Sequence, residues 1–195
     1  MVRALLTAAV EENASWCDVF CRIRGVSGVF GPRAWTAPAR TPEFYPDAVT
    51  LTADATAADV LPFVDASAGC SVKDSFATLD LPGFGVLFEA SWLHFPVRPA
   101  AAWVASASPD PSFVHLHGSS GTAIAHRGAR AVGLSNVTGA DWPGAVAGAA
   151  AAFPGLPVVG YEHGADLAAA LACGATRLGE LRVWVAACQN GTHDA

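Results

Sequence analysis

The last third of the chain alternates strand-like and helix-like segments with few residues between them. In chain order the segments are residues 130–137, 141–153, 156–161, 166–173 and 178–185. The first, third and fifth are apolar, turn-bounded runs typical of strands, while the other two are rich in alanine and have helical character. Gly155 and Gly174 follow the two helices closely, as residues that end helices do. This alternation predicts crossover units packed on a sheet that is covered on both faces.

The strands at 130–137 and 156–161 are predicted to be parallel neighbours. The helix at 141–153 supplies the crossover that a parallel pair needs, and such crossovers are right-handed. In sheets of this type, ligands lie where neighbouring strands diverge, close to helix N-termini. We therefore expect the functional site at the carboxyl ends of these two strands.

The first half of the chain has a different organisation. Apolar residues near helical spacing predict a helix over residues 2–24, which stops at Gly25. Strands are predicted near residues 48–52 and 84–94, and the proline- and glycine-rich residues 26–46 read as an irregular arm. The fold class is thus predicted to be α+β, with a mixed β-sheet flanked by helices. Two regions are expected: an α+β N-terminal region, 1–99, and a C-terminal region, 100–195.

Composition argues against some classes of partner. The formal net charge is −6 and Lys73 is the single lysine, so the chain lacks the concentrated basic face that nucleic-acid binding requires. The most apolar window, residues 145–159, contains prolines and is too short to span a membrane. Five dispersed cysteines suit reduced thiols without disulfides in a cytoplasmic protein. We expect no nucleic-acid and no membrane partner, and the oligomeric state stays open.

Three segments carry a resemblance to a known family: residues 156–162, 166–173 and 174–184. They resemble the C-terminal half of the Gcn5-related N-acetyltransferase (GNAT) superfamily, where a strand, a helix and a final strand follow one another in this way. Residues 133–137, which precede the helix at 141–153, resemble the strand that binds acyl-CoA in that superfamily. The resemblance covers about residues 103–187, and the whole chain looks like divergent GNAT-like proteins of high-GC actinobacteria. It implies a GNAT-like C-terminal half and acyl transfer from acyl-CoA to a small amine.

The resemblance also implies roles for residues of this chain. Acetyl-CoA or another acyl-CoA would place its pantetheine arm along one set of residues: Leu134, Ser135 and Val137. Its pyrophosphate would lie at the start of the helix 141–153, at Gly139, Ala140, Asp141 and Trp142. Asn136 would add an amide to the carbonyl site, or is a turn residue that completes the strand end. Glu162 and Tyr161 would handle protons, or serve the next loop and the core.

Two signature features of the superfamily are absent from the chain. Residues 138–145 read Thr-Gly-Ala-Asp-Trp-Pro-Gly-Ala, with an acidic residue where a phosphate-binding loop carries basic residues and spaced glycines. Ala170 stands where a tyrosine often protonates the departing thiolate. A second hypothesis is therefore a GNAT-like protein that has lost CoA binding and binds or transforms another small molecule in the cleft between the two halves.

A separate group of polar residues lies in the first half and is a candidate substrate-binding site. Lys73 and Asp74 stand in an apolar neighbourhood, and a partly buried lysine can act as a base or hold an anion. The alternative is a surface pair at a helix start. Glu89 lies on the following predicted strand and is a candidate to face the same small-molecule substrate. His94 has the opposite strand parity, so at most one of the two faces that site.

Three histidines are candidate metal ligands. His115 and His117 alternate on one predicted strand and so share a face, and His126 lies on the next strand. No carboxylate stands at a convincing companion spacing, so we expect no metal. The Cys17 and Cys21 pair, one helical turn apart, reads as small buried apolar side chains.

Overall fold

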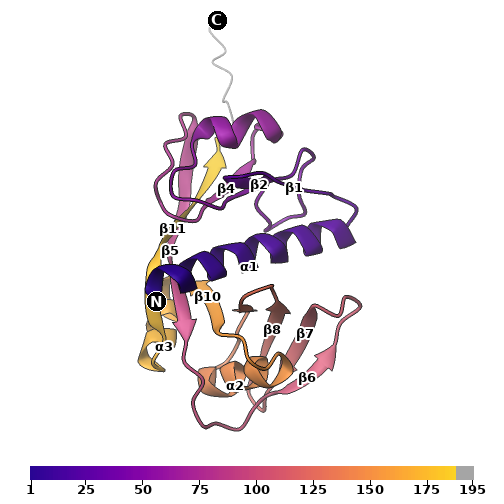
Figure 1. Ribbon diagram of the computed structural model, residues 1–195, viewed down its shortest axis with the longest axis vertical. Helices are drawn as coiled ribbons and strands as arrows, with labels where there is room; N and C mark the ends of the chain where they lie inside the picture. The colour runs from indigo at the N-terminus through magenta and orange to yellow at the C-terminus, as the bar shows by residue number, and fades with distance from the viewer. Residues whose placement is uncertain (188–195) are drawn as a thin grey trace, which may run out of the picture. The chain divides into compact units, whose positions relative to one another are not determined.

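The computed structural model describes residues 1–187, which form two compact units. The first comprises Met1–Trp16 with Ala90–Glu180, and the second comprises Cys17–Glu89 with the chain from Leu181. Three elements contribute residues to both units (Figure 1): α1 (Val2–Ile23), β5 (Phe84–Phe95) and β11 (Thr176–Ala186). The units are discontinuous in sequence, and the division into regions 1–99 and 100–195 remains a prediction. None of the described helices is both long and apolar enough to cross a membrane.

The first unit contains a mixed sheet. Its strands are β6 (Val104–Ala107), β7 (Phe113–His117), β8 (Thr122–Arg127), β9 (Val132–Ser135), β10 (Val158–Glu162) and the second part of β5. Neighbours from β6 to β9 are antiparallel, β9 and β10 are parallel, and β10 and β5 are antiparallel. The α+β class, the mixed sheet and the parallel pair predicted from the sequence are thus confirmed.

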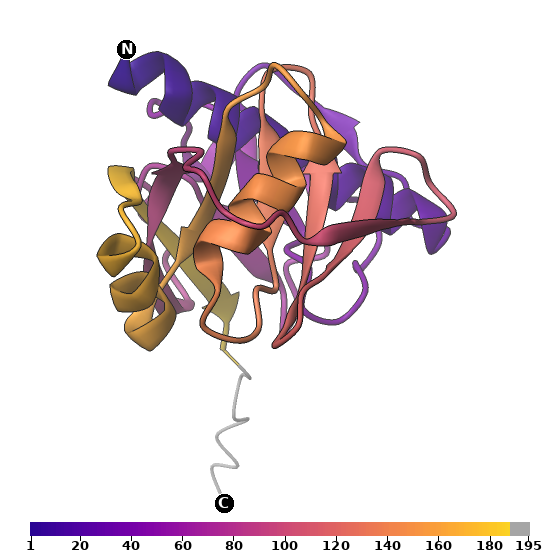
Figure 2. The same cartoon turned by 90° about the horizontal axis from the view of Figure 1, so that it is seen from below.

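Helices α2 (Trp142–Ala152) and α3 (Gly164–Ala172) pack on one face of this sheet, which α2 crosses in Figure 2. Alternate residues of the strands meet them, among them Leu93, Leu116 and Val158. Asp141 begins α2 as its N-cap, and the helix ends where Pro154 follows. The α2 helix predicted over 141–153 and the α3 helix predicted over 166–173 are both present within a few residues.

Helix α1 covers the opposite face of the sheet in the first unit, where Glu12 and His126 form a buried hydrogen bond. The Glu12 Oε1 lies 2.7 Å from the Nδ1 of His126, and both side chains are buried. Trp16 packs edge-on against Phe113, with ring centroids 5.1 Å apart. Gly133 in β9 faces Glu12, and a Cβ at this glycine would overlap the Glu12 carboxylate. The glycine therefore provides the space in which the buried carboxylate lies.

The second unit contains a set of strands that pair in mixed directions. Its strands are β1 (Val29–Phe30), β2 (Ala34–Thr36), β3 (Ala48–Thr50), β4 (Ser71–Asp74) and the last part of β11. The β3–β4 pair is parallel and the other pairs are antiparallel. One face packs on two short 3₁₀ helices, η1 (Ala57–Asp59) and η2 (Leu61–Phe63), through a small apolar core that includes Val60 and Val72.

Two local expectations for the second unit need correction. The arm at 26–46 contains the β1–β2 hairpin, whose strands are too short to show a sequence period. Lys73 and Asp74 lie in strand β4, so the alternative that placed them at a helix start is wrong.

Four cysteines (Cys17, Cys21, Cys70 and Cys173) are thiols, while Cys188 lies outside the described residues.

Candidate active site

Strands β9 and β10 diverge at their carboxyl ends. They pair at only two positions, Val158 with Val132 and Val159 with Gly133. Beyond these, β10 stays paired with β5 as far as Glu162, and β9 stays paired with β8 as far as Ser135. The two strands thus follow different neighbours from this point, as expected for a ligand-binding opening in a parallel pair.

Gly160 lies at the point of divergence. A Cβ on this residue would lie 2.5 Å from the carbonyl oxygen of Leu134, closer than any real Cβ contact. The glycine therefore lets the two backbones approach before they separate. Any larger residue would push β10 away from β9 and change the width of the opening.

Glu162 is the last residue of β10 and has unusual surroundings. Its side chain is half-buried, and no hydrogen bond or ion pair to its carboxylate is found within residues 1–187. Burial, with a smaller contribution from the nearby Asp166 carboxylate, raises the pKa of Glu162 from 4.5 to about 7. A carboxyl group with this pKa exchanges its proton at neutral pH, which is typical of functional acids and bases.

Tyr161 and Glu162 leave β10 on opposite faces of the sheet, since neighbouring strand residues alternate. The Tyr161 ring lies on the side of Trp92, edge-to-face at 5.4 Å between centroids. Glu162 has the parity of Val158 and therefore points to the face that α2 and α3 cover. Of the two residues predicted to handle protons, only Glu162 faces these helices.

The strand partner of Glu162 is Ser91 of β5, which belongs to a small polar chain. The buried Ser91 hydroxyl accepts a hydrogen bond from Arg177 Nη1 at 2.6 Å and donates one to Glu180 Oε2 at 3.0 Å. Arg177 and Glu180 also form an ion pair at 3.5 Å. A guanidinium group is thus held next to the strand position opposite Glu162.

Asn136 follows β9 directly and has φ of +54°, in the left-handed region that asparagine tolerates better than most residues. It reverses the chain before Thr138, whose backbone N–H donates to the carbonyl of Thr122 at 2.8 Å. The Asn136 side chain is exposed and Ser135 is half-buried. Asn136 therefore has the turn role weighed from the sequence, at a position where its exposed amide remains free to meet a ligand.

The start of α2, predicted to receive a pyrophosphate, already holds an anion of the chain itself. Asp141 Oδ1 accepts a hydrogen bond from the backbone N–H of Gly144 at 3.0 Å, and Oδ2 accepts one from the indole Nε1–H of Trp103 at 2.8 Å. These bonds fix both carboxylate oxygens. The helix N-terminus that would attract a phosphate is therefore capped from within.

Trp103 is a residue of this site that no sequence pattern singles out. Its ring is buried and lies against Gly118, Gly121 and Gly144, and its backbone lies against Gly148. A Cβ at Gly144 would lie 2.6 Å from the indole nitrogen, and one at Gly148 would lie 2.8 Å from the Trp103 carbonyl oxygen. The only sequence signal was the concentration of glycines in two separate segments.

The predicted substrate-binding residues lie in the second unit and have structural partners. Lys73 is buried in the middle of β4, between Val49 of β3 and Val183 of β11. The buried Asp74 accepts a hydrogen bond from the backbone N–H of Leu79 at 2.8 Å, which shapes the turn after the strand. Glu89 forms an exposed pair with Arg182 at 2.8 Å.

The histidines considered as metal ligands are in different surroundings. His126 is buried and paired with Glu12, while His115 and His117 are exposed on β7. The Nε2 of His117 lies 3.0 Å from the Ser106 hydroxyl. Within residues 1–187, no cluster of three potential metal-ligating side chains is present.

No family model and no curated protein matches the chain. Among solved structures, the chain is similar to the crystal structure of a protein assigned as an acetyltransferase of the GNAT family from Novosphingobium aromaticivorans. The two share 11% sequence identity over 87% of this chain and 94% of the other, with a TM-score of 0.47.

Proposed function

We propose that this protein transfers an acyl group to a small amine, with Glu162 as the general base. One observation carries the proposal: a half-buried carboxyl group with a pKa near 7, and with no hydrogen bond or ion pair among residues 1–187, stands at the carboxyl end of two diverging parallel strands. Burying such a group without compensation costs stability, and groups of this kind concentrate at functional sites.

The chemistry required of Glu162 is the removal of one proton. A small amine is an ammonium ion at neutral pH and is not a nucleophile until it loses a proton. The Glu162 carboxylate accepts that proton, directly or through one water, as the nitrogen attacks the acyl carbonyl carbon of a thioester. The carbon–sulfur bond then breaks, and the departing thiolate takes the second proton from the nitrogen, which leaves a neutral amide and a free thiol. Because the carboxylate is the active form, the acylation rate should rise as the pH passes through about 7.

The acyl donor would lie along the diverging strand ends. An extended chain with amide groups can pair with a strand whose backbone groups have lost their neighbour. The backbone of Leu134, Ser135 and Val137 is the candidate for this contact. Asn136, with its exposed amide, is the candidate to stabilise the negative charge that develops on the carbonyl oxygen.

The fit of a whole acyl-CoA at this site is poor. The pyrophosphate expected near Gly139, Ala140, Asp141 and Trp142 would meet the Asp141 carboxylate, whose two oxygens already hold a backbone N–H and the Trp103 indole. At an effective dielectric near 20, two like charges about 4 Å apart repel by roughly 4 kcal/mol before screening by salt. A donor without the nucleotide avoids this repulsion.

The experiment compares two donors against a panel of small amines. Acetyl-CoA and the short thioester S-acetyl-N-acetylcysteamine are incubated with the protein, and acylated amines are detected by mass spectrometry. We expect the short donor to serve at least as well as acetyl-CoA, and Glu162→Gln to abolish transfer from both. Asp141→Asn should increase transfer from acetyl-CoA but not from the short thioester. Asp80→Asn, at an exposed position, should leave transfer from both donors unchanged. Transfer that persists undiminished in Glu162→Gln would refute the role of Glu162.

The Asp141–Trp103 contact also favours a second function, binding of a small molecule without any CoA. The Asp141 carboxylate occupies the N-terminus of α2, where the phosphates of a nucleotide would otherwise bind. If no amine is acylated from either donor, and calorimetry at millimolar acetyl-CoA detects no binding by wild type or Asp141→Asn, the acyltransferase proposal fails and this alternative stands.

A further inference from the structure

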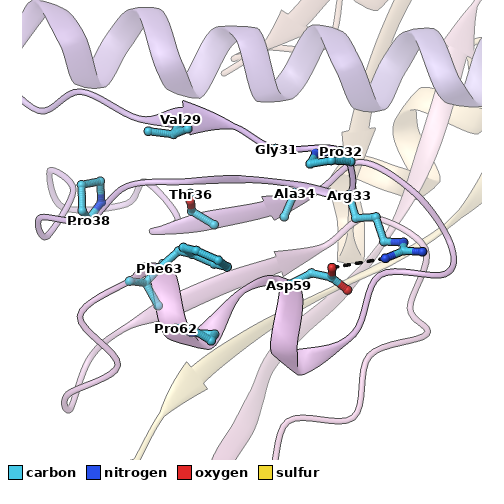
Figure 3. Close-up of a pocket in the computed structure, with 11 residues that line it drawn as sticks. Val29, Gly31, Pro32, Arg33, Ala34, Thr36, Pro38, Asp59, Pro62 and Phe63 are labelled. Atoms are coloured by element: carbon cyan, nitrogen blue, oxygen red, sulfur yellow. Dashed lines mark hydrogen bonds and ion pairs between the residues drawn. The ribbon is translucent and has the colours of Figure 1, made fainter.

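The second unit contains a cavity of about 620 Å³ that the acyl-transfer proposal does not use. It lies between the β1–β2 hairpin and the two 3₁₀ helices, as Figure 3 shows. Its size is within the range of small-molecule sites, which are mostly apolar with a few polar groups that fix the ligand. The same description applies to the walls of this cavity.

Most of the lining is apolar, and part of it is exposed. Val29 of β1 is 61% exposed and Phe63 of η2 is 57% exposed, and both border the hollow. Figure 3 shows the Phe63 ring in the space between η2 and strand β2, with Pro62 beside it. Large apolar side chains left in water around a hollow indicate a surface that a ligand covers.

One end of the cavity is charged. Arg33 Nε lies 3.1 Å from an Asp54 oxygen, and Arg33 Nη1 lies 3.5 Å from Asp59 Oδ1. Figure 3 shows the Arg33–Asp59 pair at this end. Two carboxylates surround one guanidinium, so the local formal charge is negative, and an anionic ligand is disfavoured there.

The Asp59 carboxylate is held in a fixed position. Its Oδ2 accepts hydrogen bonds from the backbone N–H of Thr56 at 2.9 Å and from the Thr56 hydroxyl at 2.8 Å. Within the described part of the chain, its Oδ1 has a single contact, the long one of 3.5 Å to Arg33. A donor group of a ligand can therefore reach this oxygen without breaking the Thr56 contacts.

We propose that this cavity binds a small amphipathic amine, with its apolar body along Phe63 and Val29 and its ammonium group at Asp59. The apolar walls provide most of the buried area, and the negative end selects the cation over a neutral or anionic head group. This inference concerns a separate site and does not depend on acyl transfer.

The test uses three ligands of the same shape. The binding of 4-phenylbutylamine, 4-phenylbutanol and 4-phenylbutyrate to the full chain is measured by calorimetry at low ionic strength. The amine should bind about fivefold more tightly than the alcohol, as a partly exposed ion pair allows, and the acid should bind most weakly. Equal affinities, tighter binding of the acid, or no binding of the amine at millimolar concentration would overturn the proposal.

Two pairs of variants locate the binding. Asp59→Asn should remove the preference for the amine, while Asp80→Asn, which removes the same charge from an exposed position outside the cavity, should retain it. Phe63→Ser should weaken the binding of the amine and of the alcohol by the same factor. Phe44→Ser, at a 94% exposed position outside the cavity, should leave the binding of both unchanged. Equal losses within either pair would show that the ligand binds elsewhere. Thermal unfolding confirms that each variant is folded.

Discussion

The Asp141 carboxylate joins the indole N–H of Trp103 to the first turn of helix α2, with contacts of 2.8 Å and 3.0 Å on its two oxygens. One acidic side chain thereby caps a helix and satisfies a buried indole. The same side chain occupies the place where the sequence resemblance puts a pyrophosphate. Under the proposed function, this contact disfavours an acyl donor that carries a pyrophosphate.

Removing the Asp141 side chain should therefore destabilise the protein. Asp141→Ala loses the cap, worth about 1 kcal/mol, and leaves the buried Trp103 N–H without an acceptor, which costs about 1–3 kcal/mol. Asp141→Asn keeps one acceptor oxygen and should cost less. Urea unfolding measures both, with Asp80→Ala as an exposed control. An Asp141→Ala variant as stable as the control would contradict the dual role.

Gly148 should behave unlike an ordinary helix glycine. Replacing a glycine inside a helix by alanine normally stabilises by up to about 1 kcal/mol. Here a Cβ would lie 2.8 Å from the Trp103 carbonyl oxygen, so Gly148→Ala should destabilise instead. Ala147→Gly in the same helix gives the ordinary propensity effect for comparison. Stabilisation by Gly148→Ala would contradict this, because it would mean that the Trp103 backbone moves aside with no loss of stability.

Gly133 and Glu12 should be energetically coupled. A Cβ at Gly133 would overlap the Glu12 carboxylate, which the His126 ring holds at 2.7 Å. Gly133→Ala should cost roughly 1–3 kcal/mol, as overpacking in a core does. The cost should shrink in a Glu12→Ala background, and a double-mutant cycle measures the difference. Additive effects would exclude the contact.

Glu162 should cost the protein stability above neutral pH. Its pKa is raised in the folded state, so the folded chain holds the proton more tightly than the unfolded chain, and stability is lost as the pH rises from 4.5 through about 7. Each tenfold difference in proton affinity between the folded and unfolded chain corresponds to about 1.4 kcal/mol, so the loss of stability reaches about 3 kcal/mol. Glu162→Gln should accordingly be more stable than wild type at pH 8 and equal to it at pH 4. Glu43→Gln, at an exposed position, is the matched control, and a gain that is the same at both pH values would argue against the titration of Glu162 as its cause.

The fold was predictable where the pattern is local. Apolar runs and glycine boundaries sufficed for the helix at 2–24 and for the parallel strands β9 and β10 with α2 between them. Glu162 could be placed at the end of β10 for the same reason. Alternation along β10 also implies that Tyr161 and Glu162 face opposite sides of the sheet, although the family resemblance implies a proton-handling role for each.

Features that depend on distant contacts were not predictable. Glu12 looks like a surface residue of an amphipathic helix, and its burial depends on His126, which lies 114 residues away. The glycines around Trp103 have a role only once the indole is placed among them. The β1 strand has two residues, too few to show a period, so the cavity beside it had no sequence signal.

The most direct test of the account is the titration of Glu162 itself. Carbon-13 chemical shifts of the glutamate side-chain carboxyl groups are followed from pH 3 to pH 9, and the Glu162→Gln variant identifies the resonance. A pKa for Glu162 near 7 is predicted from its burial and the nearby Asp166 carboxylate. A value near 4.5, the ordinary value of a solvated glutamate, would contradict the assignment of Glu162 as the group that takes the proton at neutral pH.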